Sequence, residues 1–508
     1  MAYSNKYQTK INLLFNVITF AINALIGLVL PAFLIDKLGV GTYSLIPISM
    51  SITSFMLIIT VAINGTLSRF LSIDFATDFK SVNTTFSTSY FVLLGLFLIF
   101  MPLLFLFVYN PSLFLNISEN NINDSRILFG TIIIAFVLNS FASLFNSIAY
   151  VKNRINLQNI SLIINRLGII IFLTALFLIG YINVQAYGIA VLFSTIISFI
   201  YSYKIAKKLH PNLEIRFSLF DTSKFKLLSK LGFWLMVNQV GVLLFLQTDI
   251  LVVNNLLGEE KSGIFGTLIQ WSFLIRTIIG IFSTVFGPLT LNLYANQQID
   301  KLIEFTKLTT KLLGILSSVI AVIIVYFAKD ILRVWLGVEF EEYTFILQVM
   351  IFHLGFNLAY SSIVNINIAY NKAEIPGVVT LLTGVLNICL GIVLIKYTSL
   401  GILAVAISGF ISLTIKNFVF TPLYAAKIMG IQWYTYIRTI FSSLIITLFG
   451  VGLTVCFSSE RFQINSFIEL IMGCIVLTLV LGAGAWFLLR KEEKIQVKEV
   501  ILSKIGNQ

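Results

Sequence analysis

Charged side chains are scarce in this chain, and so are the residue types that build metal and disulfide sites. Only 11% of the 508 residues are Asp, Glu, Lys or Arg, whereas 58% are hydrophobic. A soluble chain carries roughly 25% charged residues, so a soluble globular fold is excluded. The 3 cysteines and 2 histidines show no CxxC or HExxH spacing. Zinc and disulfide frameworks therefore have no support, and no metal or other cofactor is expected.

Long hydrophobic runs dominate the sequence instead. A membrane span needs about 20 mostly apolar residues, and about fourteen such runs are present. They cover approximately residues 11–34, 43–66, 86–108, 127–150, 157–179, 185–205, 232–257, 264–290, 311–328, 344–370, 376–396, 400–422, 437–457 and 465–489. The predicted fold class is therefore all-α, a polytopic membrane protein with about fourteen transmembrane helices.

Two short phrases recur after almost the same interval, each at the end of a run. Ile148-Ala149-Tyr150 returns 220 residues later as Ile368-Ala369-Tyr370. Leu38-Gly39 returns 219 residues later as Leu257-Gly258. Parallel repeats of this kind build transporters whose substrate site lies between the repeats. The predicted domains are an N-terminal six-helix lobe (1–205), a basic cytoplasmic linker (206–230), a C-terminal six-helix lobe (231–424), and two extra transmembrane helices with a cytoplasmic tail (425–508).

Lys and Arg are distributed unevenly over the connections. With a cytoplasmic N-terminus, 24 of the 34 Lys and Arg residues fall on inside segments and 7 on outside segments. The positive-inside rule then places both termini in the cytoplasm. Because these short loops account for the net charge of +12, nucleic-acid binding is not expected. Within the linker, the run from Phe217 to Leu231 fits an amphipathic helix on the inner leaflet, with a plain solvated linker as the alternative.

Polar residues recur at helical spacing inside several runs. Because an amide that faces lipid is costly, such stripes must meet protein or water. Two interpretations are open, a hydrated central cavity or interhelical hydrogen bonds that join the bundle, and the stripes taken together favour the cavity. They are Asn12, Asn16, Thr19 and Asn23 in the first run, Ser44, Pro47, Ser51 and Ser54 in the second, and His353, Asn357, Ser361 and Asn365 in the tenth.

Charges inside membrane spans are functional candidates by default. Arg166 and Arg276 lie near the middle of the fifth and eighth runs. Lys416 lies nearer the inner end of the twelfth run, where its long stem can also reach the surface. Arg69 lies at the inner end of the second run, and two interpretations are open for it: a site residue or an anchor at the membrane interface. A cationic excess suits an anionic cargo, and Arg suits phosphate because its planar fork donates two parallel hydrogen bonds.

One acidic residue, Asp249, lies inside the seventh run. It follows Asn238 by eleven residues, which places both on nearly the same face of a continuous helix. Its depth differs from that of Arg276 by about four residues, or roughly 6 Å. A structural Asp249–Arg276 pair is therefore a competing explanation for both charges.

The repeat, the fourteen runs and the cation-bearing core together resemble the multidrug/oligosaccharidyl-lipid/polysaccharide (MOP) exporter superfamily. Within it, the chain resembles the polysaccharide-biosynthesis branch, the O-antigen or repeat-unit flippases of bacteria. The residues that carry the resemblance are Pro31 with Leu38-Gly39 and Tyr43, Ser68-Arg69, and Ile148-Ala149-Tyr150 with Lys152.

The resemblance implies a V-shaped, alternating-access transporter in the bacterial cytoplasmic membrane. Its cargo would be a polyprenyl-pyrophosphate-linked oligosaccharide for O-antigen, lipopolysaccharide or capsule assembly, with the lipid tail kept among membrane lipids. The predicted substrate-binding residues are Arg166, Arg276, Arg69, Lys416, Asn16, Asn23 and Asn357. Coupling to an ion gradient is implied, with Asp249 as the candidate residue. A polysaccharide polymerase and a chain-length regulator are candidate partners.

Two other classes of function remain as alternatives. A cation-coupled multidrug antiporter of the same superfamily would favour acidic cavity residues, against the cationic excess here. A membrane polysaccharide polymerase or ligase would need a sizeable outer loop bearing Arg or His, and the longest outer connection, residues 109–126, is short and lacks His. No paired carboxylates or nucleophile–base arrangement is recognisable, so catalysis is not expected.

Overall fold

Long helices form the structure, a computed structural model that describes residues 2–77, 79–370, 372, 374–456, 466–489 and 493–494. Within these described ranges, thirteen helices are long and apolar enough to cross a membrane, or fourteen when one bent pair counts as a single span. The predicted all-α, polytopic fold class is therefore confirmed. The chain divides into two compact units, Met1–Thr267 and Leu268–Gln508.

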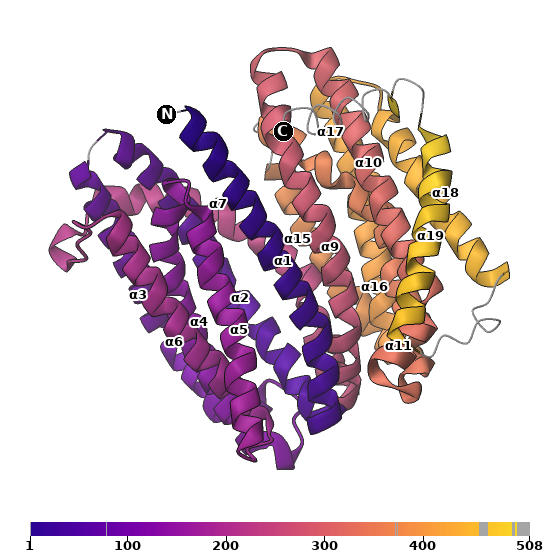
Figure 1. Cartoon of the computed structure of the whole chain (residues 1–508), viewed down its shortest axis with the longest axis horizontal. Helices are drawn as coiled ribbons and strands as arrows, with labels where there is room; N and C mark the ends of the chain where they lie inside the picture. Colours follow the sequence, from indigo (N-terminus) through magenta and orange to yellow (C-terminus); the bar gives the residue numbers. More distant parts are fainter. Residues whose placement is uncertain are drawn as a thin grey trace. The chain divides into compact units, whose positions relative to one another are not determined.

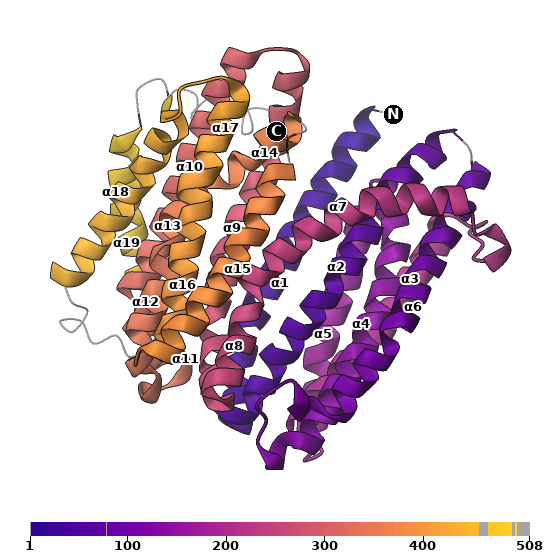
Figure 2. The same ribbon diagram turned by 180° about the vertical axis from the view of Figure 1, so that it is seen from behind.

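The N-terminal unit is a bundle of long helices (Figure 1). In it α4 packs against α2 and α6, while α1 packs against α5 and α2. Helix α7 crosses α2 obliquely and also contacts α3 (Figure 2). The elements are α1 (Ala2–Leu38), α2 (Val40–Thr77), α3 (Phe79–Tyr109), η1 (Pro111–Leu113), η2 (Glu119–Asn121), α4 (Ile122–Val151), α5 (Ile155–Leu178), α6 (Val184–Leu209), η3 (Phe217–Leu219), α7 (Thr222–Leu246), α8 (Thr248–Leu257) and the beginning of α9 (Glu259–Ala295).

The two recurring Leu-Gly phrases occupy the same kind of turn. Gly39 follows α1 with φ 78°, and Gly258 follows α8 with φ 93°. Glycine adopts a positive φ without the steric cost that a Cβ atom would impose. Each glycine leads at once into the next long helix, α2 or α9. The tight reversal of the chain gives this part of the repeat a physical reason.

Helices α4 and α6 approach each other closely at Gly188. A Cβ atom at this position would lie 2.2 Å from Thr131 Oγ1 and 3.2 Å from the Cα of Leu128. Small residues allow such backbone approach between membrane helices.

We expect Gly188→Ala to destabilise the protein by about 1–3 kcal/mol, because the added methyl group forces α6 away from α4. Gly95→Ala on α3 is the matched control, since a Cβ atom there would meet nothing within 4 Å. Thermal unfolding of the two purified variants in detergent checks the difference. Equal melting temperatures would contradict the close packing at Gly188.

The connection between α6 and α7 lies along α3. Asn83 Nδ2 donates to the carbonyl oxygen of Asn212 over 2.8 Å, and Ser87 Oγ donates to that of Glu214 over 3.1 Å. Asp221 then caps α7 by accepting from backbone N–H groups. The region predicted as a linker, 206–230, thus contains the end of α6, a short connection and the beginning of α7. An independent amphipathic helix over 217–231 is not present.

The beginning of α9 belongs to the N-terminal unit because its glycines allow it to approach α2. A Cβ atom at Gly263 would lie 2.5 Å from the carbonyl oxygen of Val40, and one at Gly266 would lie 2.7 Å from Pro47 Cγ. The boundary between the units at Thr267 therefore falls within α9. The lobe limits expected from the repeat remain a prediction.

A buried ion pair joins the end of α2 to α7. Lys224 Nζ lies 2.9 Å from Oδ1 of Asp74, whose side chain is 7% exposed. Ser81 and Thr85 of α3 donate to the same carboxylate over 3.0 and 2.5 Å. The Asp74 carboxylate thus connects three helices.

We expect Asp74→Ala to cost about 3–5 kcal/mol, because loss of one partner leaves the other charge of a buried pair uncompensated. Asp36→Ala is the control, since the Asp36–Lys37 pair is exposed and exposed pairs contribute about 0–1 kcal/mol. The melting temperatures of the two variants in detergent measure the difference. An Asp74→Ala variant as stable as the Asp36→Ala control would refute the role of Asp74 in joining the three helices.

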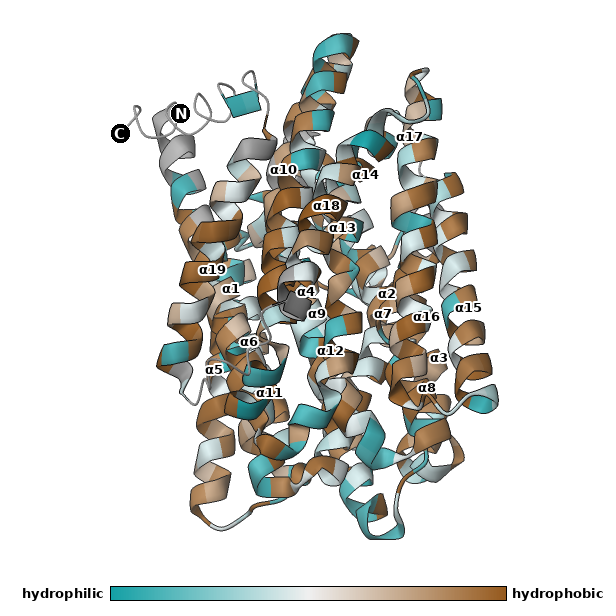
Figure 3. Ribbon diagram, turned by 90° about the vertical axis from the view of Figure 1, so that its right-hand side faces the viewer, coloured by the Kyte–Doolittle hydropathy of each residue, from teal (hydrophilic) through white to brown (hydrophobic). Residues whose placement is uncertain are grey.

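The C-terminal unit is built around α10, which packs against α12, α13, η5 and α18. Ser317 and Ser318 of α10 donate to the carbonyl oxygen of Gly355 over 2.6 and 3.0 Å, which ties α10 to α13. Figure 3 shows α19 coloured mainly as hydrophobic, as expected of a lipid-facing span. The elements are the rest of α9, α10 (Ile299–Tyr326), α11 (Ala328–Leu336), η4 (Val338–Tyr343), α12 (Thr344–Phe352), α13 (Leu354–Asn357), η5 (Leu358–Ser362), α14 (Val364–Ala369), α15 (Glu374–Tyr397), α16 (Ile402–Thr414), the π-helix η6 (Ile415–Phe420), α17 (Thr421–Met429), α18 (Thr435–Cys456) and α19 (Phe467–Leu488).

Candidate functional site

The beginning of the polar stripe on α1 is an interhelical contact. Asn12 Nδ2 donates to the carbonyl oxygen of Asn153 over 3.0 Å, and Asn12 Oδ1 accepts from the backbone N–H of Asn156 over 3.0 Å. Gln8 Oε1 accepts from Arg154 Nη1 over 2.7 Å. These bonds join α1 to the beginning of α5. Interhelical hydrogen bonding within the bundle therefore explains why a polar residue lies at position 12.

Farther along α1, two predicted binding residues are less fully used. Asn16 Oδ1 accepts from Asn159 Nδ2 over 2.6 Å, although the Asn16 side chain remains exposed. Asn23 is half-buried, and its Oδ1 has no hydrogen-bond partner among the described residues. These two amides can still form hydrogen bonds with a polar ligand. The Asn12 amide instead forms its hydrogen bonds with the beginning of α5.

The polar stripe on α2 packs against protein. Ser44 is fully buried beside Gly263, and Pro47 contacts Gly266. Ser51 Oγ donates to the carbonyl oxygen of Gln247, the residue between α7 and α8. Contacts with protein therefore explain Ser44, Pro47 and Ser51 without a cavity, whereas Ser54 Oγ donates within its own helix to the carbonyl oxygen of Met50 over 2.8 Å.

That break corrects the prediction of one continuous seventh span. The segments on either side of Gln247, residues 239–246 and 248–257, are bent by 41°. Asn238 and Asp249 therefore lie on different helices, α7 and α8, so their spacing along one continuous helix no longer applies. Asp249 lies in the first turn of α8 and is 8% exposed. It belongs to the N-terminal unit and Arg276 to the C-terminal unit, so their pairing remains a prediction.

Two predicted cations of the N-terminal unit lie on helix surfaces. Arg166 is exposed on α5, and it is close enough to the buried Tyr187 of α6 to interact with it electrostatically. Arg69 is exposed near the end of α2. Neither residue forms a salt bridge in the described part of the chain. Both guanidinium groups therefore remain accessible.

Lys152, which follows the first Ile-Ala-Tyr phrase, has a structural contact outside the membrane spans. Its Nζ donates to the carbonyl oxygen of Leu209 and lies 5.0 Å from the centre of the Phe75 ring. Burial lowers the pKa of Lys152. Burial also lowers the pKa of the neighbouring His210, and the positive charges of Lys152 and Lys207 lower it further.

The tenth span changes helix type along its length, which divides its predicted stripe. It consists of α12, α13, the 3₁₀-helix η5 and α14, and a 3₁₀ segment turns every three residues, so residues at i+4 steps drift off one face. Ser361 accepts from Ser283 Oγ of α9 through its carbonyl oxygen over 2.9 Å. Asn365 lies beside Gly287 of α9. His353 and Asn357 instead meet α16.

Asn357 is the most enclosed of the predicted binding residues, with 1% of its surface exposed. Its Nδ2 donates to Thr414 Oγ1 over 2.9 Å and lies 3.3 Å from Nδ1 of His353. The His353 ring stacks on Phe410 at a centroid distance of 5.6 Å. Asn357 Oδ1 has no hydrogen-bond partner among the described residues, so it retains an acceptor.

Two predicted cations come together in the C-terminal unit. Arg276 of α9 is near enough to act electrostatically on Lys416 of η6 and also on His353 and Tyr360. Lys416 Nζ lies 5.8 Å from the centre of the Tyr360 ring, within cation–π range. We call Arg276, His353, Asn357, Tyr360 and Lys416 the cationic cluster. Like charges in one place repel each other, so the cluster is suited to bind an anion.

A π-helix positions Lys416. Pro422 lacks a backbone N–H and cannot continue regular α-helical bonding. At the end of the segment Ile415–Phe420, the carbonyl oxygen of Lys416 accepts from the backbone N–H of Thr421, five residues further on, and also from Thr421 Oγ1 over 2.9 Å. Such π-segments frequently lie at functional sites. The sequence pattern identified Lys416 but not Tyr360 or the π-helix. Pro422, near the end of the run, was the available signal for the π-helix.

The described residues contain no group of three or more His, Cys, Asp or Glu side chains able to hold a metal ion. The polar residues that the structure brings together are amides, hydroxyls and cations. Such groups bind hydroxyl-rich and anionic ligands through hydrogen bonds and charge.

Comparison with solved structures identifies the class of fold. The chain superimposes on the lipid II flippase MurJ in its inward closed conformation with a TM-score of 0.69 and 20% identity, covering 93% of this chain and 98% of that one. It superimposes on an inward-facing multidrug resistance MATE family transporter of the MOP superfamily with a TM-score of 0.65 and 13% identity, covering 81% and 95%. The fold is that of the MOP transporters.

The chain belongs to the polysaccharide biosynthesis protein family, whose model matches residues 8–291. It is also 27% identical over 497 residues to the uncharacterized membrane protein EpsK of Bacillus subtilis (strain 168), covering 96% of each chain. The polysaccharide-biosynthesis branch of the MOP superfamily, predicted from the sequence, is thereby confirmed. The chain is a multi-pass membrane protein of this family.

Proposed function

We propose that this protein is a flippase that moves polyprenyl-pyrophosphate-linked oligosaccharide repeat units across the bacterial cytoplasmic membrane by ion-coupled alternating access. The product would feed the assembly of a surface polysaccharide such as O-antigen or capsule. The observation that carries the proposal is the cationic cluster inside a bundle with the MOP fold. Membership of a polysaccharide biosynthesis family agrees with this cargo.

The chemistry of the cluster favours a phosphate-bearing cargo. A charge inside a membrane bundle is costly, and a bound anion stabilises the cations there. Arg276 can donate two parallel hydrogen bonds to one phosphate, and Lys416 adds a point charge. Asn357 Oδ1 can accept from a sugar hydroxyl.

The N-terminal unit would contribute a second set of contacts. Arg166 can bind the pyrophosphate or an acidic sugar, and Asn16 and Asn23 can bind sugar hydroxyls. Arg69, near the end of α2, would meet the cargo at the cytoplasmic surface. This arrangement assumes both termini in the cytoplasm, as the distribution of Lys and Arg indicates.

Asp249 is our candidate for ion coupling. Its carboxylate is the acidic group of the seventh span, and it is buried where α8 begins. A buried carboxylate that binds a cation in one step of transport and releases it in another is neutralised only while the cation is bound. The net charge at this position then differs between the steps. A polysaccharide polymerase and a chain-length regulator would act on the exported product.

The fold shared with the MATE transporter makes a cation-coupled multidrug antiporter the second candidate. The deciding experiment is deletion of the gene in its host, followed by analysis of lipid-linked glycans and surface polysaccharide. We expect the surface polymer to disappear while complete repeat units accumulate on the cytoplasmic side. Normal surface glycan with increased sensitivity to cationic drugs would overturn the flippase and favour the antiporter.

A further inference from the structure

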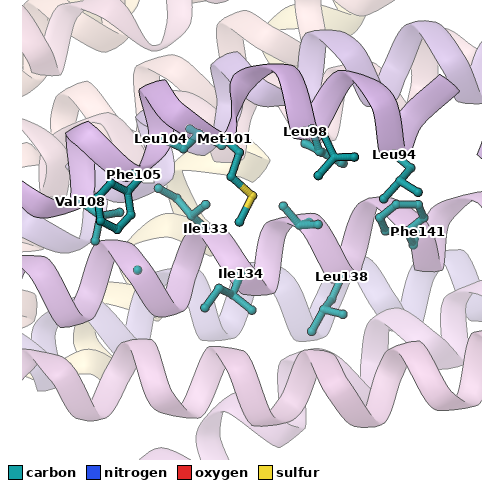
Figure 4. Close-up of a pocket in the computed structure, with 13 residues that line it drawn as sticks. Leu94, Leu98, Met101, Leu104, Phe105, Val108, Ile133, Ile134, Leu138 and Phe141 are labelled. Atoms are coloured by element: carbon teal, nitrogen blue, oxygen red, sulfur yellow. The ribbon is translucent and has the colours of Figure 1, made fainter. Parts of the chain in front are cut away.

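An apolar groove runs along the surface of the N-terminal unit between α3 and α4. It encloses about 420 Å³, which lies in the usual range for ligand sites, about 300–1,000 Å³. Side chains of the two helices face each other across it (Figure 4). They are Leu94, Phe97, Leu98, Met101, Leu104, Phe105 and Val108 of α3 and Gly130, Ile133, Ile134, Val137, Leu138 and Phe141 of α4.

The groove is open along one side. Leu98, Met101 and Phe105 are 60%, 61% and 69% exposed. Because α3 and α4 are both of spanning length and composition, the medium beside these side chains is lipid. Gly130 removes a side chain from the wall, since a Cβ atom there would have one neighbour, Val108 Cγ1, at 3.5 Å.

A fixed cation stands at one end of the groove. Arg126 lies on the same face of α4 as Gly130, Ile134 and Phe141, at spacings of four, eight and fifteen residues. Its Nε donates to the carbonyl oxygen of Tyr109 over 2.8 Å, and its guanidinium lies 5.6 Å from the centre of the Tyr109 ring. The Tyr109 ring in turn stacks on Phe105, inside the groove, at 6.1 Å.

Arg126 retains donors for an anion. Nη1 donates to Asn123 Oδ1 over 3.3 Å, so two of the five guanidinium N–H groups are used within the protein. The remaining donors can bind a phosphate, for which guanidinium geometry is well suited. Arg126 lies in the second turn of α4, near the beginning of a candidate span, where a long cationic side chain can reach the depth of lipid headgroups.

We propose that this groove binds one phospholipid of the surrounding bilayer, with an acyl chain between α3 and α4 and its phosphate against Arg126. From Val108 to Leu94 the groove follows fourteen residues of helix, or about 21 Å. One leaflet of the hydrocarbon core is about 15 Å thick. A chain that starts at Arg126 can therefore stay in contact with protein down to the middle of the bilayer. The site holds a structural lipid and is separate from the cationic cluster.

The test is native mass spectrometry of the full-length protein released from detergent after incubation with phosphatidylglycerol or, in parallel, phosphatidylcholine. We expect one phospholipid to be retained per chain, with phosphatidylglycerol preferred because it has no compensating headgroup cation. Arg126→Gln should weaken phosphatidylglycerol retention by about tenfold, as expected for loss of a hydrogen bond to a charged group. Arg126→Lys should retain part of it.

Two variants test the groove itself. Gly130→Phe and Leu98→Trp fill it from opposite walls and should each abolish retention, whereas Gly130→Ala should not. Lys396→Gln, at an exposed cation at the end of α15, is the matched charge control. A variant whose melting temperature lies within a few degrees of that of the unsubstituted protein is folded. Because there are two blocking variants, the test remains decisive if one of them fails to fold.

Three results would overturn the proposal. One is unchanged phospholipid retention in Arg126→Gln and in a folded blocking variant. Another is retention of added polyprenyl phosphate that phosphatidylglycerol does not displace, which would make the carrier lipid the occupant. The third is a dimer that the blocking variants disrupt, which would mean that a second copy of the chain covers the groove.

Discussion

Arg276→Ala is expected to lower export of the lipid-linked oligosaccharide by about 100-fold while leaving the protein in the membrane. Each hydrogen bond from a charged donor contributes about 1.5–3 kcal/mol, and loss of a bidentate pair therefore corresponds to a factor of at least 100. Arg276→Lys should recover only part of the rate, because an ammonium keeps the charge and loses the fork. The measurement is complementation of the deletion strain, with surface polymer quantified against the amount of membrane protein.

The comparison among cations makes this result specific. Lys416→Ala should reduce export less than Arg276→Ala, because Lys416 offers a point charge only. Arg166→Ala tests the contribution of the N-terminal unit in the same assay. Lys396→Ala removes an exposed cation outside the cluster and should leave export unchanged. Full activity of both arginine variants would refute a phosphate-binding role for these residues.

Asp249→Asn is expected to abolish the part of transport that an ion gradient drives. A cation that moves down 100 mV supplies about 2.3 kcal/mol, so coupling to one cation supports roughly a 50-fold concentration ratio across the membrane. The amide keeps the size and hydrogen-bonding ability of the carboxylate and removes its charge. Proteoliposomes loaded with lipid-linked oligosaccharide, with imposed proton or sodium gradients, would show that ratio falling to one in the variant.

Glu260→Gln is the control for Asp249→Asn. Glu260 is an exposed acid in the first turn of α9, so its charge is screened by solvent and its removal should leave the coupling intact. The cation whose gradient drives the unsubstituted protein identifies the coupling ion. An Asp249→Asn variant that responds to both gradients as the unsubstituted protein does would reject Asp249 as the coupling residue.

Only part of the candidate site could be predicted from spacing. Arg276 and Lys416 were identified as charged residues in apolar runs. That Arg276 of α9 comes near enough to Lys416 of η6 to act on it electrostatically was visible only in the tertiary structure. Asn12 and Ser51 were expected on the polar stripes of the first and second runs, which together favoured a cavity, yet both are used in contacts between helices. Sequence spacing gives the face of a helix on which a side chain lies, and the neighbouring helix decides whether that face meets water or protein.

The sequence by itself determined the polytopic all-α class, the number of spans and the family. These follow from hydrophobic length and from short phrases such as Leu38-Gly39, whose glycine is required by a local turn. The tertiary structure alone decided where the seventh span breaks, at Gln247, and where the helix type changes, in η5 and in the π-helix that carries Lys416. A break leaves backbone carbonyl groups unsatisfied inside the membrane unless another helix supplies a donor. At Gln247 that donor is Ser51, almost two hundred residues earlier in the chain, and no local pattern contains that information.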